Sequence, residues 1–234
     1  MLPILFSLGD LHFYSYPLFM GIAWGVGFHL SKSLLKLPAQ TFNLLFWGSF
    51  LSSWIGAKVF FLISSPDYLT HGSFWFGGGF VFYGGIIFGL LYFLIFWYLG
   101  EDIKLKDLGI LSIPICISQG LGRLGCFLAG CCFGKDTTLP WAVHLHDKFR
   151  HPVQLYESLG LFLLGYLLWK SRKNNLFALY FIGYGVLRFL LEFLRGDEIR
   201  GITSWGLSYS QIVSIVLIIT GLIIKLRSSR VPLP

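Results

Sequence analysis

The chain has 234 residues, of which 55% are hydrophobic and only 12% carry a charge. Soluble domains carry about twice that share of charged residues, so the composition excludes a soluble globular protein and predicts an integral membrane protein. The net charge of +7 comes from lysines and arginines scattered over short loops. This scatter argues against a nucleic-acid partner and is typical of a positive-inside distribution.

Seven segments are long and apolar enough to cross the roughly 30 Å hydrocarbon layer as helices. Proline and glycine mark the breaks between them. In chain order the segments are 16–35, 41–63, 80–99, 108–133, 153–169, 176–194 and 207–226. We therefore expect an all-α polytopic membrane protein of about seven transmembrane helices, with a single membrane domain over residues 1–234.

The distribution of basic residues predicts the orientation of these helices. Alternate breaks are richer in lysine and arginine than those between them. The richer breaks are 32–36, 104–106, 170–173 and 225–230. The positive-inside rule places them in the cytoplasm, so the N-terminus is expected outside and the C-terminus inside. An odd number of helices agrees with termini on opposite faces.

Arg123 lies within the otherwise lipid-compatible segment 108–133. A permanent charge at bilayer depth costs roughly 2.5 to 17 kcal/mol by competing estimates, so it needs a partner. Small residues around it allow a backbone or a ligand to approach closely. They are Gly120, Gly122, Gly125, Ala129 and Gly130. A guanidinium in such surroundings indicates a bound anion, most simply a phosphate. Alternatively, Glu157 or Glu192 neutralises Arg123 from another helix.

Further charged residues fall within or at the edges of the predicted segments. They are Lys58, Glu157, Arg188 and Glu192. Tyr184, Arg188, Glu192 and Arg195 recur at helical spacing, which predicts one inward-facing stripe. Glu192 can pair with either arginine. The stripe is therefore either an internal ion-pair ladder between helices or part of a functional site.

Two other stretches combine polar or flexible residues with membrane-length segments. His151, Gln154 and Glu157 form a polar stripe at the start of the fifth segment, where a proline suits the first helical turn. This stripe is either a helix cap or part of the site. The glycine-rich stretch 77–85 permits a tight re-entrant turn or close approach to a lipid headgroup.

Six short motifs follow one another along the chain. They are SYPLFM (15–20), YGGI (83–86), GRLGCFLAGC (122–131), HPVQLYE (151–157), YGVLRFLLEFLR (184–195) and SQIVS (210–214). In the same order they resemble the patterns SYGLM, HGGL, GRIGNFxNGE, HPSQLYE, YxxxRFxxEFxR and SxGQxLS of the prolipoprotein diacylglyceryl transferases, polytopic enzymes of the bacterial inner membrane. The resemblance therefore covers nearly the whole chain.

The resemblance implies transfer of diacylglycerol from phosphatidylglycerol to the lipobox cysteine of a prolipoprotein, in a multi-pass protein of the bacterial inner membrane. It implies no metal and no cofactor. Arg123 and Arg188 are the candidates for stabilising the phosphate, with Glu192 holding Arg188 and Tyr83 near the reacting groups. The expected substrate-binding residues are Arg123, Tyr16, Gly84, Gly85, Gln154, Glu157, Tyr184 and Arg195.

The chain departs from the family patterns at several positions. Tyr83 stands where many members have a histidine, and a tyrosine hydroxyl is a poor base at neutral pH. Cys126, Ala129 and Cys131 replace an asparagine, a second asparagine and an acidic residue. The group that removes the proton from the acceptor thiol is therefore not identified by the sequence.

Alternatives remain open for the cysteines and for the function. Cys126, Cys131 and Cys132 are expected simply to pack, with a structural disulfide and a metal or catalytic role as alternatives. The competing function is a transporter or flippase of an anionic lipid or substrate that uses the same arginines. A transporter favours internal repeats, and none is evident here. A thiol-redox enzyme is disfavoured because no CxxC spacing occurs.

Overall fold

The computed structural model describes residues 2–9, 11–66, 81–100, 108–171, 175–197 and 201–229. Contacts divide the chain into two compact units. The first comprises Met1–Leu34 and Gly109–Pro234, and the second comprises Leu35–Leu108. The prediction of a single membrane domain stays a prediction.

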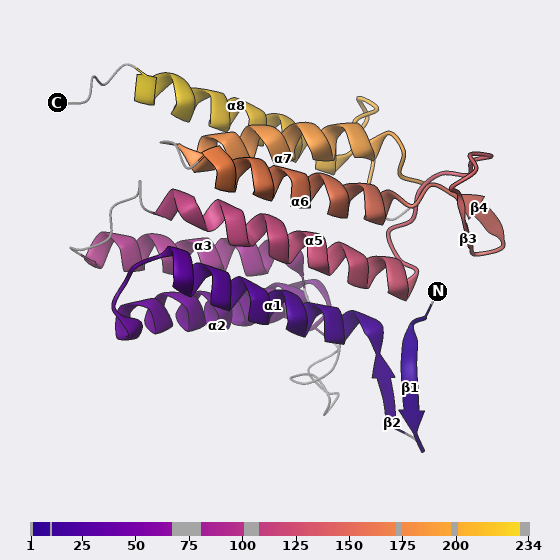
Figure 1. Cartoon of the computed structure of the whole chain (residues 1–234), viewed down its shortest axis with the longest axis horizontal. Coiled ribbons are helices and arrows are strands. Elements are labelled where there is room, and N and C mark those ends of the chain that lie inside the picture. Colours follow the sequence, from indigo (N-terminus) through magenta and orange to yellow (C-terminus); the bar gives the residue numbers. More distant parts are fainter. Residues whose placement is uncertain are drawn as a thin grey trace. The chain divides into compact units, whose positions relative to one another are not determined.

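The first unit is built from helices that pack in chain order. They are α1 (Ser15–Leu34), α5 (Ser112–Ala129), α6 (Val153–Ser171), α7 (Leu176–Glu192) and α8 (Tyr209–Ser229), with the short 3-10 helix η2 (Gly109–Leu111) before α5. Each helix contacts the next one in this series (Figure 1). The buried core between them contains Ile113, Cys116, Leu161, Leu168, Leu176 and Tyr180.

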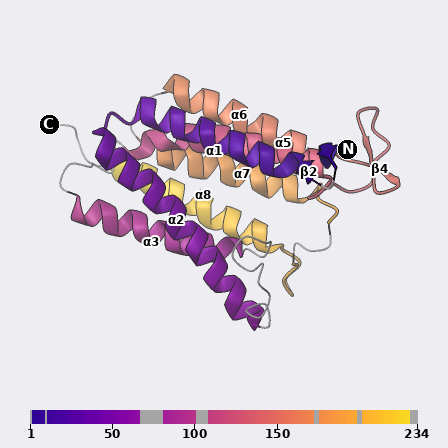
Figure 2. The same cartoon turned by 90° about the horizontal axis from the view of Figure 1, so that it is seen from below.

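The second unit is the pair formed by α2 (Ala39–Ser64) and α3 (Phe82–Leu99), which cross each other (Figure 2). The α2 and α3 backbones pack closely because both helices have glycine at the contact. A Cβ added to Gly84 would collide with the carbonyl oxygen of Gly56. The Ser52 hydroxyl also donates a 2.9 Å hydrogen bond to the Phe88 carbonyl. Small residues and interhelical hydrogen bonds are typical of helix contacts in membranes.

Two antiparallel hairpins in the first unit were not predicted from the sequence. One joins β1 (Ile4–Leu8) to β2 (Leu11–Tyr14), and the other joins β3 (Val143–Leu145) to β4 (Lys148–Arg150). The second turn places His146 and Asp147 at φ 50° and 59°, which is the backbone that two-residue hairpin turns require. The apolar periodicity used for helices gives no signal for such short strands.

The observed helices follow the predicted segments closely, with one correction. The predicted segment 108–133 ends earlier, because Gly130 adopts φ 75° and caps α5 after Ala129. Among the described residues, three helical stretches are long and apolar enough to cross a membrane: Ala39–Ser64, Gly109–Ala129 and Tyr209–Arg227. The protein is therefore mainly helical with membrane-spanning character, while the number of crossings stays a prediction.

Candidate active site

Arg123 forms an ion pair with a carboxylate of the neighbouring helix. Its Nε atom lies 3.0 Å from Oε2 of Glu157 on α6, whose side chain is only 3% exposed. The sequence left Glu157 and Glu192 open as carboxylate partners of Arg123, and the structure shows Glu157 in this role. This ion pair is formed through Nε and not through the two terminal nitrogens of the guanidinium. Arg123 keeps 24% of its side chain exposed, which leaves room for a ligand to reach it.

Arg188 approaches the same carboxylate from α7. Its Nη1 lies 3.7 Å from Oε2 of Glu157, and its Nη2 lies 3.0 Å from Oε2 of Glu192 one helical turn further on. Nη2 also donates a 3.1 Å hydrogen bond to the hydroxyl of Ser210 at the start of α8. Glu157 therefore lies between two guanidinium groups from different helices, and Glu192 holds Arg188 as predicted from their spacing.

Arg123, Glu157, Arg188 and Glu192 form an ion-pair cluster. One nitrogen of this cluster donates no hydrogen bond to a described residue. Nη1 of Arg188 is buried and makes no hydrogen bond to any described residue, because 3.7 Å to Glu157 is too long for one. A buried donor without an acceptor costs about 1–3 kcal/mol, and more when it is charged. A ligand oxygen placed at this nitrogen removes that cost. The cluster is therefore suited to bind an anionic oxygen.

Two tyrosines of α7 extend the cluster. The Tyr184 hydroxyl donates a 3.4 Å hydrogen bond to Oε1 of Glu157, so both oxygens of that carboxylate have partners. Tyr180 stacks on Tyr184 with ring centroids 5.8 Å apart and donates a hydrogen bond to Gln119 of α5. The predicted inward-facing stripe of α7 is thus confirmed from Tyr184 to Glu192.

Arg195 is placed differently from the prediction. Helix α7 ends at Glu192, so Arg195 lies beyond the helical stripe, in a segment bridged to Gly134. Its guanidinium forms a bidentate ion pair with the carboxylate of Asp197. Its Nη1 atom lies 4.0 Å from Oε2 of Glu192. Asp197 was not predicted from the sequence, because helical spacing does not indicate which residues lie close together beyond the end of α7.

The amide nitrogen of Gln154 binds the backbone after α5 instead of the arginine cluster. Its Nε2 donates a 2.6 Å hydrogen bond to the Cys131 carbonyl, and the side chain is almost fully buried. One turn later the Ser158 hydroxyl donates to the Gly120 carbonyl. The polar stripe of α6 therefore does two things: Gln154 fixes the loop after α5, and Glu157 pairs with the arginines.

Tyr16 belongs to the same unit and lies beside α5. A Cβ added to Gly125, two residues after Arg123 on α5, would be 3.6 Å from the Tyr16 ring, and the Tyr16 side chain is exposed. Glycine at this position of α5 is what allows α1 to approach, as the pattern of small residues around Arg123 predicts. Tyr16 is thus available to a ligand at Arg123.

The remaining predicted residues lie in the second unit. Tyr83, Gly84 and Gly85 occupy the first turns of α3, where both glycines pack against α2, and Lys58 lies on α2. The structure thus shows a packing role for the glycines. The predicted re-entrant turn falls partly on residues 77–80, which lie outside the described residues.

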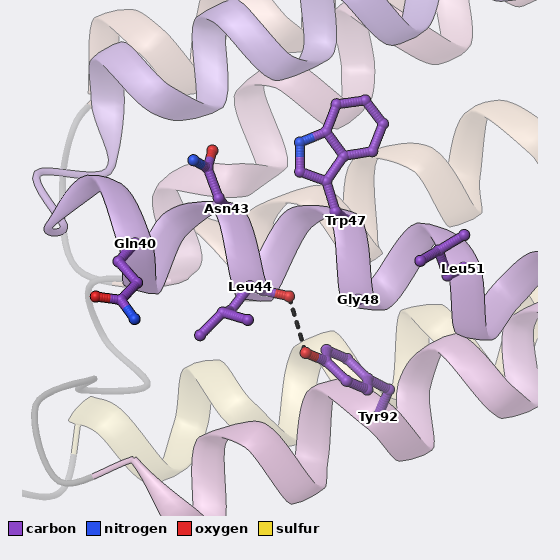
Figure 3. A pocket seen from close by; sticks show the side chains of 7 residues that line it. All are labelled: Gln40, Asn43, Leu44, Trp47, Gly48, Leu51 and Tyr92. Carbon is purple, nitrogen blue, oxygen red and sulfur yellow. Dashed lines mark hydrogen bonds between the residues drawn. The ribbon is translucent and has the colours of Figure 1, made fainter.

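The second unit also has an open hollow of about 680 Å³ that contains none of the predicted site residues. Figure 3 shows its lining, with the hydroxyl of Tyr92 on α3 directed at the Leu44 carbonyl on α2. Gln40 and Asn43 supply polar groups at the start of α2, and the rest of the lining is mainly apolar. None of the described residues that line this hollow carries a charge.

The cysteines at the end of α5 are not all packed in the interior. Cys126 and Cys132 are partly buried, but Cys131 is exposed, so the expectation that these thiols simply pack is wrong for Cys131. Cys116 is fully buried in the core between helices. All four cysteines are free thiols in the structure.

The apolar helices hold two arginines that share the carboxylate of Glu157, and no described residue accepts a hydrogen bond from the buried Nη1 of Arg188. Such a site suits an anionic group bound within a membrane protein. The chain belongs to the prolipoprotein diacylglyceryl transferase family, whose model matches residues 3–227. It is therefore a membrane enzyme of the transferase class.

Proteins similar to this chain carry the name phosphatidylglycerol–prolipoprotein diacylglyceryl transferase. The protein of Clostridium tetani is 36% identical, with 96% of each chain covered. That of Finegoldia magna is 32% identical, covering 94% of this chain and 92% of the relative. That of Idiomarina loihiensis is 30% identical, covering 97% and 93% respectively.

Proposed function

We propose that this protein transfers the diacylglyceryl group of phosphatidylglycerol to the lipobox cysteine of a prolipoprotein. Family membership and the names of the similar proteins support the substrate pair. The observation that carries the proposal is the position of Glu157 between Arg123 and Arg188, with a buried, unused donor on Arg188. That donor supplies a binding point for a lipid phosphate.

The reaction creates negative charge at the phosphate. The sulfur of the acceptor cysteine attacks the glyceryl carbon, the carbon–sulfur bond forms and the carbon–oxygen bond breaks. The electron pair of the broken bond leaves with the phosphate, which departs as glycerol phosphate. A phosphodiester with one negative charge becomes a monoester with about −1.5 to −2 at pH 7. Groups that stabilise this growing charge lower the barrier.

We propose that Arg123 and Arg188 supply that stabilisation. Their guanidinium groups are held from α5 and α7 by one carboxylate, Glu157, so they need little reorganisation when the phosphate charge grows. Glu192 and Ser210 fix the second nitrogen of Arg188. We assign Arg123 and Arg188 to the phosphate, and Glu157 and Glu192 to their positioning.

The acceptor thiol must lose its proton before or during attack, because the thiolate is the nucleophile. We propose that Tyr83 accepts or donates a hydrogen bond at the reacting groups in place of a histidine. The proton itself then passes to solvent or to the departing phosphate, which can bind it with a pKa of about 6. Tyr16, Tyr184, Gly84, Gly85, Gln154 and Arg195 complete the proposed substrate-binding set.

We further propose a multi-pass arrangement in the bacterial inner membrane, with about seven crossings. The asymmetry of lysine and arginine supports a cytoplasmic C-terminus and an N-terminus outside. Reporter fusions at both termini test this orientation. A fusion that is active in the cytoplasm at the N-terminus contradicts it.

The transfer reaction is tested with protein reconstituted in vesicles that contain phosphatidylglycerol and a lipobox peptide. We expect the peptide to gain one diacylglyceryl mass and an equal amount of glycerol phosphate to appear. A peptide whose cysteine is replaced by serine is the control. If neither product forms, but labelled phosphatidylglycerol crosses between leaflets, the transporter hypothesis replaces this proposal.

A further inference from the structure

Three thiols converge at the end of α5, outside the ion-pair cluster. The sulfur atoms of Cys126, Cys131 and Cys132 all lie within 4.8 Å of one another. Cys126 is in the last helical turn, and the other two follow the helix. The proposed transfer reaction uses none of these thiols.

The backbone holds this arrangement without a ligand. Gly130 ends α5 in the left-handed conformation, and the Cys131 amide then donates a 3.2 Å hydrogen bond to the Cys126 carbonyl. Cys132 itself has φ 59°, which costs a non-glycine residue roughly 1–2 kcal/mol. Buried Gln154 fixes the same turn by donating to the Cys131 carbonyl at 2.6 Å. The turn is therefore anchored by the helix before it and by α6.

We infer that Cys126, Cys131 and Cys132 form a binding site for one Cu(I) ion. Metal–thiolate bonds of about 2.3 Å in a planar triangle place three sulfur atoms about 4 Å apart, within the observed spread of 4.8 Å. Thiolates select Cu(I) and Zn²⁺ over harder ions. Zinc prefers four ligands, whereas a set of three sulfurs matches Cu(I).

The charges around the thiols suit this ion. Three thiolates and Cu(I) carry a net charge of −2, which needs nearby cations. Arg123 precedes Cys126 by three residues on α5, so both share one helix face. The Arg195 backbone is bridged to Gly134, two residues after Cys132.

Metal binding to the full-length protein tests the inference independently of the transfer reaction. The protein is reduced in detergent without oxygen, and Cu(I) is added in competition with a chromogenic chelator. We expect one Cu(I) per chain and an X-ray absorption spectrum with sulfur neighbours only. Cys131→Ser alters an exposed side chain and is expected to fold. Its Cu(I) affinity is expected to fall by at least about 100-fold, because even the outer-shell partners of metal ligands contribute about 10–100-fold. Cys116→Ala removes a thiol outside the cluster and keeps the full affinity.

Thiol labelling gives a second readout that does not depend on any variant. Bound Cu(I) is expected to protect three of the four cysteines from alkylation, and mass spectrometry identifies them as Cys126, Cys131 and Cys132. The inference is overturned if no Cu(I) binds, if Cys131→Ser and the unchanged protein bind it equally, or if only Zn²⁺ is retained. A disulfide between Cys126 and a neighbouring cysteine, together with no Cu(I) uptake after reduction, also overturns it.

Discussion

The Nε atom of Arg123 on α5 lies 3.0 Å from Oε2 of Glu157 on α6. This contact turns a charge that is costly in a membrane helix into half of a buried ion pair, and the same oxygen also faces Arg188. Breaking a buried pair by removing one partner leaves an uncompensated charge. The consequences of removing either partner can be measured.

Glu157→Gln keeps the shape of the side chain but removes its charge from between the two arginines. We expect a loss of about 3–5 kcal/mol in the free energy of unfolding, together with weaker transfer activity because the arginines are no longer held. Thermal unfolding in detergent and the peptide transfer assay measure the two effects.

Asp136→Asn is the matched control for Glu157→Gln. Asp136 lies on the surface, where Lys148 and Arg150 hold the pKa of its carboxyl below the ordinary value. Exposed ion pairs contribute little to stability, so this variant is expected to unfold at nearly the same temperature as the unchanged protein. Equal losses in both variants contradict a special role for Glu157.

Arg123→Ala and Arg188→Ala are expected to lower kcat by at least about 10²–10³-fold, since each removes a cation that stabilises the growing phosphate charge. Arg188→Lys keeps the charge but loses the planar fork whose Nη1 faces Glu157 and whose Nη2 contacts Glu192 and Ser210, so it is expected to restore little activity. Turnover at the original rate in either alanine variant removes that residue from the phosphate site. Membrane extraction checks that each variant is still inserted.

Gly125 and Gly122 of α5 are predicted to respond to alanine in opposite ways. A Cβ at Gly125 would lie 2.8 Å from the Phe19 Cβ on α1, whereas a Cβ at Gly122 would make an ordinary 3.8 Å contact with Met20. Overpacking costs about 1–3 kcal/mol, while alanine favours a helix by about 1 kcal/mol over glycine. We expect a lower melting temperature for Gly125→Ala and an equal or higher one for Gly122→Ala.

Tyr83→Phe tests whether the hydroxyl in the histidine position takes part in the reaction. Loss of one hydrogen bond worth about 0.5–1.5 kcal/mol is expected to lower kcat up to about tenfold, with little change in stability. Tyr98→Phe, at the other end of α3, is the control. If the rate of Tyr83→Phe is unchanged, the hydroxyl is not used in proton transfer.

The sequence predicted the helices and the buried charges well, because apolar length and isolated charges are local signals. It also gave Glu157 and Glu192 as candidate partners of the arginines. It did not predict which carboxylate meets Arg123, since that depends on how α5 and α6 pack. Asp197 and the two hairpins were missed because their positions depend on chain reversals and short strands that have no apolar period.

The three cysteines show the same limit more clearly. Their sequence spacing is not that of a known metal motif, so packing was the natural expectation. Their convergence comes from the left-handed backbone at Gly130 and Cys132. Backbone reversals of this kind in non-glycine residues are rare, and the residue types alone do not reveal them.

The short segment after the thiols has a mechanical consequence. Backbone hydrogen bonds join residues 133–135 to the start of α6, where the Gly134 amide donates to the His151 carbonyl and the His151 amide donates to the Lys135 carbonyl. The same residues are joined to the segment after α7. There the Lys135 amide donates to the Leu194 carbonyl, and the Gly196 amide donates to the Phe133 carbonyl. One stretch of chain thus ties the start of α6 to the end of α7. Its amides should exchange with deuterium as slowly as those of the helices, so we expect this end of the first unit to be as rigid as the helices that it joins.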